Sequence, residues 1–169
     1  MKGEEIPLKM LSQDPYSQWL GIEILESRIG YCKVALTIRA EMLNSMGKAH
    51  GGISYALADS CFGFTANTHG KFAVSIETSI NHIEALNEGD YITAECSIEK
   101  VNNKLGFNII EVKRCQKKGS GADEKGNRAD EKRNVADEKG NVADEKGNGN
   151  EELVALFKGV VYRTNKDWE

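Results

Sequence analysis

The sequence lacks the features that mark several large functional classes. Only 7% of its 169 residues are aromatic, only 2 are proline, and 22 basic residues against 26 acidic ones leave a formal charge of −4. Nucleic acids and anionic membranes are bound by clusters of lysine and arginine, and no such block occurs, so neither is an expected partner. No apolar run approaches the roughly 18 residues of a membrane span and no secretory leader opens the chain, so we expect a cytoplasmic protein.

Metal-ligand spacing is also missing. The four cysteines are far apart with no C-x-x-C pair, and the three histidines add no ligand pattern. We expect buried, reduced thiols at all four cysteine positions, and neither a metal site nor an organic cofactor. The cysteines are Cys32, Cys61, Cys96 and Cys115.

A low-complexity block interrupts the second half of the chain. Residues 119–150 contain no aromatic residue and no Leu, Ile or Met, and a seven-residue Ala-Asp-Glu-Lys unit recurs four times from Ala122 to Gly149. Interior glycines and the scarcity of apolar residues disfavour a coiled coil, and the acidic residues do not follow the EF-hand pattern. We therefore expect an inserted, mobile loop at 119–150 and a single domain formed by residues 1–118 and 151–169.

The rest of the chain predicts the element order β-β-α-β-β-β-β. Short helical turns are expected in the first 20 residues, with Asp14-Pro15 as a start signal. Strands are expected over 22–28, 31–39, 72–85, 90–101, 105–116 and 153–164, with one long helix over 50–68. One helix against an antiparallel sheet is an α+β fold. The repeat then falls in the turn between the last two strands, where a longer loop costs only on the order of 2 kcal/mol in closure entropy.

One carboxylate stands alone in the predicted helix. Between Ala49 and Gly70 the only charged residue is Asp59, and its neighbours in the sequence are apolar. A helix that is apolar on nearly every side is a buried one, and a carboxylate there carries a desolvation penalty unless it is bound or used. Asp59 is therefore a functional-site candidate. The alternative is a structural Asp59 that bonds Ser54, Ser60 or a neighbouring subunit.

The start of this helix offers a second element. Gly51 and Gly52 allow close approach of a ligand, while the first-turn N–H groups have no partner inside the helix. Such donors suit a carbonyl oxygen that becomes an oxyanion. Gly51 and Asp59 are eight residues apart, about 12 Å along the axis and about 80° around it. One copy of the helix can hardly bring both to one carbon, but two copies in a dimer could.

These residues resemble a known family. The pattern N-x-x-G-x-x-H-G-G followed by L-A-D, from Asn44 through His50-Gly51-Gly52 to Asp59, is similar to that of the hotdog-fold acyl-CoA thioesterases, in their phenylacetate-degradation (PaaI-like) branch. The resemblance covers roughly 19–116 and 153–164. It implies a hotdog fold, in which the antiparallel sheet wraps around the helix, and a homodimer or dimer of dimers with its sites at the subunit interface.

The resemblance also implies roles for individual residues. The Gly51 amide would polarise the thioester carbonyl of an acyl-CoA, and Asp59 would act as nucleophile or general base. Asn44 would position the water or the thioester, and His50 would order the helix start and contact substrate. Substrate contacts are further implied for Gly52, Ser75, His82 and Lys104, while Glu84 departs from the small or basic residue that relatives often carry.

Other readings of the same residues stay open. Asn44 can cap a turn, His50 can be a helix-start histidine, and Ser75 can be one of many strand hydroxyls. At the level of the whole chain, the alternatives are a non-catalytic acyl-CoA-binding module and a self-associating scaffold whose function lies in the repeat. A hotdog dehydratase fits less well, because the local Asp and His pattern of those enzymes is absent.

Overall fold

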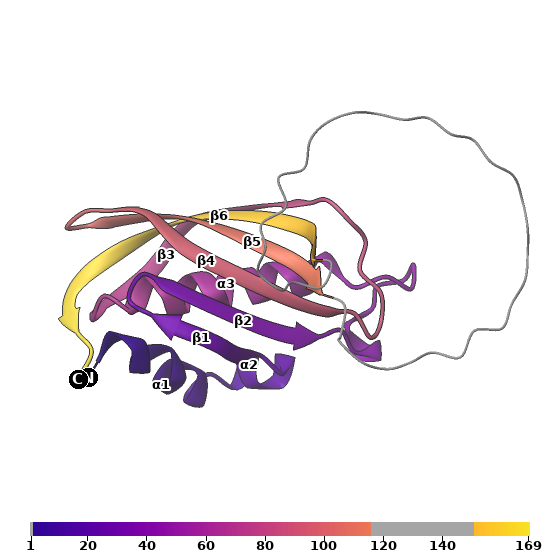
Figure 1. Ribbon diagram of the computed structural model, residues 1–169, viewed down its shortest axis with the longest axis horizontal. Coiled ribbons are helices and arrows are strands. Elements are labelled where there is room, and N and C mark those ends of the chain that lie inside the picture. The colour runs from indigo at the N-terminus through magenta and orange to yellow at the C-terminus, as the bar shows by residue number, and fades with distance from the viewer. Residues whose placement is uncertain (1, 116–150) are drawn as a thin grey trace, which may run out of the picture.

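The computed structural model describes residues 2–115 and 151–169, in which a long helix lies against a six-stranded antiparallel sheet (Figure 1). The heptad repeat at 119–150 and the mobile loop predicted for it lie outside these residues. The helices are α1 (Ile6–Ser12), α2 (Pro15–Leu20) and α3 (Gly51–Asn67), with short 3₁₀ turns η1 (Gly3–Glu5) and η2 (Ala40–Met42). The strands are β1 (Glu23–Arg28), β2 (Tyr31–Thr37), β3 (Lys71–His82), β4 (Tyr91–Val101), β5 (Leu105–Cys115) and β6 (Glu151–Asp167).

The strands lie in the order β1-β2-β4-β5-β6-β3, and all neighbours are antiparallel. The strand that follows the helix, β3, is thus an edge strand beside the last strand of the chain. The connection from β3 to β4, residues 83–90, is longer than the predicted turn and joins strands that are not neighbours. Cys115 pairs with Glu151 across β5 and β6, so the segment between them does connect adjacent strands.

Local sequence sets both ends of α3. His50 has an extended backbone and its Nδ1 accepts the Gly52 N–H at 2.9 Å, which caps the first turn. At the other end, Gly70 has a φ of 80°, which favours glycine, and Asn67 bonds back to the Gly63 carbonyl. The predicted helix over 50–68 therefore agrees with the structure to within one residue at each end.

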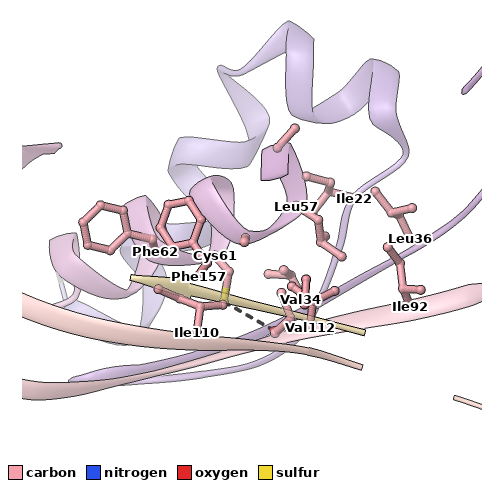
Figure 2. Packing of buried hydrophobic residues seen from close by; sticks show 14 of the residues in the cluster. Ile22, Val34, Leu36, Leu57, Cys61, Phe62, Ile92, Ile110, Val112 and Phe157 are labelled. Carbon is pink, nitrogen blue, oxygen red and sulfur yellow. Dashed lines mark hydrogen bonds between the residues drawn. The ribbon is translucent and has the colours of Figure 1, made fainter. Parts of the chain in front are cut away.

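The core fills the space between α3 and the sheet (Figure 2). Leu57, Cys61 and Phe62 point from the helix toward the sheet, where Phe62 meets Phe157 with ring centroids 5.8 Å apart. The position of the β6 strand under the Phe62 ring requires a residue without a side chain, because a Cβ on Gly159 would lie 2.6 Å from Phe62. All four cysteines are free thiols, as expected, and three of them are buried; Cys115 departs from the expectation because it is only half-buried.

Helix α1 packs along α3 (Figure 1), and the Lys9 ammonium of α1 donates to the backbone carbonyl of Glu169 at 3.1 Å. Asp14 accepts the N–H groups of Tyr16 and Ser17 and so caps α2, as the Asp-Pro signal predicts. Ser17 in turn bonds Ser60 of α3 at 3.0 Å. This arrangement closes one flank of α3 and leaves a stripe of it uncovered.

Candidate active site

Asp59 lies on the stripe of α3 that faces away from the sheet. The side chain is half-buried, and no hydrogen bond or ion pair to it is found within residues 2–115 and 151–169. Burial alone raises the pKa of the Asp59 carboxyl above its ordinary value, since no cation offsets the lost hydration. The carboxylate lines a cavity of about 510 Å³. Its walls are Met10, Asp14, Tyr16, Gly52, Tyr55, Ala56, Ser60, Gly63 and Phe64.

The structural alternatives for Asp59 within one chain do not occur. Ser60 bonds Ser17, and Ser54 contacts the Gly51 carbonyl and His82. Neither hydroxyl therefore compensates the carboxylate. A half-buried acid without a partner costs stability and is the kind of group that active sites retain.

Gly51 lies in a second depression, on another flank of α3. Its N–H belongs to the first residue of the helix and finds no acceptor in the described part of the chain. The depression has a volume of about 310 Å³. Its walls are Asn44, Met46, Lys48, Ala49, His50, Gly51, Ser54, His82, Ile83, Glu84, Ala85 and Leu86.

Within one chain, the structure therefore keeps the Asp59 carboxylate and the Gly51 N–H apart. Asp59 and Gly51 line different depressions, as their spacing along the helix predicts. The same depression does unite Gly51 with Asn44, His50 and His82. Gly52 lines the Asp59 cavity instead, and its N–H is already bonded to His50.

The side chains of Asn44 and His50 both have structural roles. The Asn44 side-chain oxygen accepts the N–H groups of Met46 and Lys48, at 2.8 and 3.2 Å, and so caps the turn before the helix. His50 caps the helix itself. Their side-chain positions at the rim of the Gly51 depression support substrate contact, but the roles expected for them stay predictions.

Ser75 and Lys104 lie away from Gly51 within the chain. Ser75 pairs with Val161 seven residues before His82, roughly 20 Å along the strand. The Lys104 carbonyl accepts the N–H of Arg163, which lies opposite Ala73 near the start of β3. One chain thus does not bring either residue to the Gly51 amide, and their substrate contacts stay predictions.

Two side chains near the site were not assigned to it from the sequence. Ser54 lies within hydrogen-bond distance of His82, and Tyr55 shares a 2.6 Å hydrogen bond with Thr78 of β3. Ser54 follows Gly51 by three residues, so helical spacing places it on the same side of the first turn. Its contact with His82 depends on where β3 runs, which the sequence does not reveal.

Two further expectations concern metals and membranes. Among the residues that the structure describes, no group of three or more His, Cys, Asp or Glu side chains is arranged to hold a metal ion. Over the same residues, no helix has the length and apolar character needed to cross a membrane.

Comparison with known proteins gives one consistent picture. Residues 46–118 match the family model described as Thioesterase superfamily. A putative esterase of Archaeoglobus fulgidus is 32% identical over 165 residues, which are 98% of this chain and 85% of that protein. The acyl-coenzyme A thioesterase PaaI of Escherichia coli is 31% identical over 109 residues, 64% of this chain and 78% of that protein.

Solved structures agree with these relatives. The Escherichia coli PaaI protein from the phenylacetic acid degradation operon superposes with a TM-score of 0.75 and 25% identity, covering 98% of this chain and 96% of that one. A Streptococcus mutans protein bound to acetyl CoA has a TM-score of 0.64 and 18% identity, covering 87% and 91%. At that identity the second match shows a shared fold alone.

Proposed function

Because the chain belongs to the thioesterase superfamily, in its PaaI-like hotdog branch, we propose that it hydrolyses acyl-CoA thioesters to a free acid and CoA. The observation that carries this proposal is Asp59, a half-buried carboxylate with no partner in the described residues and a raised pKa. A pure binding module gains nothing from such a group, whereas a hydrolase needs a base near neutral pH.

The reaction needs two groups on opposite sides of the thioester carbonyl. The Gly51 N–H donates to the carbonyl oxygen and stabilises the negative charge that develops there, an effect worth roughly 3 to 4 kcal/mol of barrier. Asp59 takes a proton from water as the water oxygen attacks the carbonyl carbon. We assign Asp59 the role of general base, and its raised pKa makes the carboxylate a stronger proton acceptor.

The two groups meet only across a subunit interface in this proposal. Gly51 of one subunit and the partner subunit's Asp59 flank the same thioester. The exposed edge strand β3 supports the association: Val74 and Ile76 are 54% and 57% exposed, unusually high for apolar strand residues. Pairing of β3 with its copy would join two sheets and bring the two α3 helices side by side.

The test is thiol release from a panel of short, medium and aryl acyl-CoAs. We expect turnover by the wild-type protein, and a loss of about 100-fold or more in kcat for Asp59→Asn, which retains shape but cannot accept the proton. Tight binding of acyl-CoA without turnover would instead identify a binding module. Unchanged turnover in Asp59→Asn would refute the assignment of the base.

A further inference from the structure

A second polar side chain stands beside the Gly51 amide. His82, at the end of β3, occupies the place that a side chain at position 51 would take, since an ideal Cβ on Gly51 would lie 3.0 Å from its Nε2. The imidazole is exposed and lines the same depression as Gly51. Nε2 is therefore next to the space in which the thioester oxygen is expected to bind.

Ser54 contacts the other nitrogen of the ring. Its hydroxyl oxygen lies 3.2 Å from His82 Nδ1 and 3.1 Å from the Gly51 carbonyl oxygen, and the residue is only 3% exposed. A serine hydroxyl has one proton and can also accept. When Nδ1 is bare, the hydroxyl can donate to it. When Nδ1 carries a proton, the hydroxyl oxygen accepts a hydrogen bond from Nδ1–H, and the hydroxyl donates its own hydrogen to the Gly51 carbonyl. Nε2 can thus carry a hydrogen in both the neutral and the cationic ring.

We propose that His82 is the second donor of the oxyanion hole and that Ser54 is its positioning residue. The inference rests on the proposed thioesterase function. The Nε2–H of His82 and the N–H of Gly51 both donate to the thioester oxygen, and an oxygen bound there selects the ring forms that carry hydrogen on Nε2. The same Ser54 hydroxyl links the ring to the helix turn that holds the first donor.

Hydrolysis proceeds in two stages, the addition of water and the loss of the thiol. Water oxygen bonds to the carbonyl carbon, the π pair moves to the carbonyl oxygen, and both donors hold the resulting oxyanion. The pair then returns, the carbon–sulfur bond breaks and its electrons leave with sulfur. The sulfur receives the proton that Asp59 took from water, so His82 retains its own proton throughout.

Three substitutions test the assignment in the thiol-release assay. His82→Phe keeps a planar ring against Gly51 but has no N–H, and we expect kcat to fall about 100-fold with little change in KM. His82→Gln retains an amide N–H at the end of a side chain of similar reach, and we expect it to recover part of that loss. Ser54→Ala leaves the imidazole in place but unanchored, and we expect a smaller loss, again in kcat.

The matched control is Asn81→Ala, because Asn81 precedes His82 in β3 and alternation directs its side chain to the other face of the sheet. We expect the wild-type kcat from it. A His82→Phe variant with wild-type kcat and raised KM would reduce His82 to a binding residue and overturn the proposal, as would equal losses in His82→Phe and His82→Gln. A wild-type protein that releases no thiol would refute the proposed function itself, which is a separate outcome.

Discussion

At the scale of single residues, burial of the Asp59 carboxylate lowers the stability of the folded protein at neutral pH. Burial raises the pKa of the Asp59 carboxyl, so the charged form is disfavoured in the folded protein. The folded state is therefore more stable while Asp59 is protonated, and it loses that stability as the pH rises through the raised pKa. We predict that Asp59→Asn, while losing thioesterase activity, melts at a higher temperature than the wild type at neutral pH. The measurement is thermal unfolding of both proteins across a pH series.

The advantage of Asp59→Asn should disappear in acid. Below the ordinary aspartate pKa of 3.8, the carboxyl is neutral in both the folded and unfolded chain, and the two proteins should melt together. A control is Glu26→Gln, which removes an exposed carboxylate that pairs with Arg28 at the surface and should leave the melting temperature nearly unchanged. A lower melting temperature for Asp59→Asn at neutral pH would show that the carboxylate is stabilising.

The sequence was sufficient to single out Asp59 and Gly51, because each departs from its local pattern: a lone charge in an apolar helix and a glycine at a helix start. It also predicted that one helix could not bring them together, a consequence of spacing alone. It did not predict the contact between Ser54 and His82. The two residues are 28 positions apart and meet only because β3 runs back past the start of α3.

At the scale of elements, the packing of α3 on β6 depends on a missing side chain. A Cβ on Gly159 would lie 2.6 and 2.7 Å from ring carbons of Phe62, which is fully buried and cannot move aside freely. We predict that Gly159→Ala lowers the free energy of unfolding by about 1–3 kcal/mol, the usual cost of overpacking. Urea denaturation measures it.

The control for this change is its neighbour Lys158→Ala. Lys158 is exposed and its side chain lies on the other face of the sheet, so its loss should change the free energy of unfolding by no more than about 0.5 kcal/mol. An unchanged unfolding free energy in Gly159→Ala would mean that α3 and β6 are less tightly packed than described.

Element positions could largely be read from the sequence because alternation and helical periodicity are local. The helix and all six strands agree with expectation to within a few residues, the last strand being longer at its polar end, where Asp167 pairs with Lys71. The order of strands in the sheet could not be read in this way. It places β3 at an edge beside β6, and that placement comes from long-range packing around α3.

At the scale of the whole molecule, the edge strand β3 is the expected subunit contact. Ile76 is 57% exposed at this edge, so a lysine there does not disturb the core of one chain but places like charges together in a paired edge. We predict that Ile76→Lys is folded, has the mass of a monomer by light scattering, and loses thiol release. Ile29→Lys, at a site in the β1–β2 turn that is 64% exposed, should keep the wild-type mass and activity.

A monomeric and fully active Ile76→Lys protein would contradict the shared site. A dimeric variant with wild-type activity would place the interface elsewhere. Light scattering on the wild-type protein, measured alongside, distinguishes a dimer from a dimer of dimers.

Complementation between two inactive chains tests directly whether Gly51 of one subunit and Asp59 of the other form one active site. Asp59→Asn removes the base. Gly51→Pro removes the N–H donor and also places a Cβ about 3.0 Å from His82 Nε2, so it disables the whole donor side of the site on that chain. Proline suits the first position of a helix, and the preceding His50, with φ −61° and ψ 134°, already has the backbone that proline requires. Two tags allow each heterodimer to be purified after co-expression.

A site shared between subunits predicts about one half of the wild-type activity for the heterodimer of Asp59→Asn with Gly51→Pro, because one of its two sites has both groups intact. It predicts an inactive heterodimer when both substitutions are on one chain and the other chain is wild type, because each site then lacks one group. The reverse result, an inactive first heterodimer and a half-active second, would place the base and the donor in the same chain and rule out a site shared between subunits.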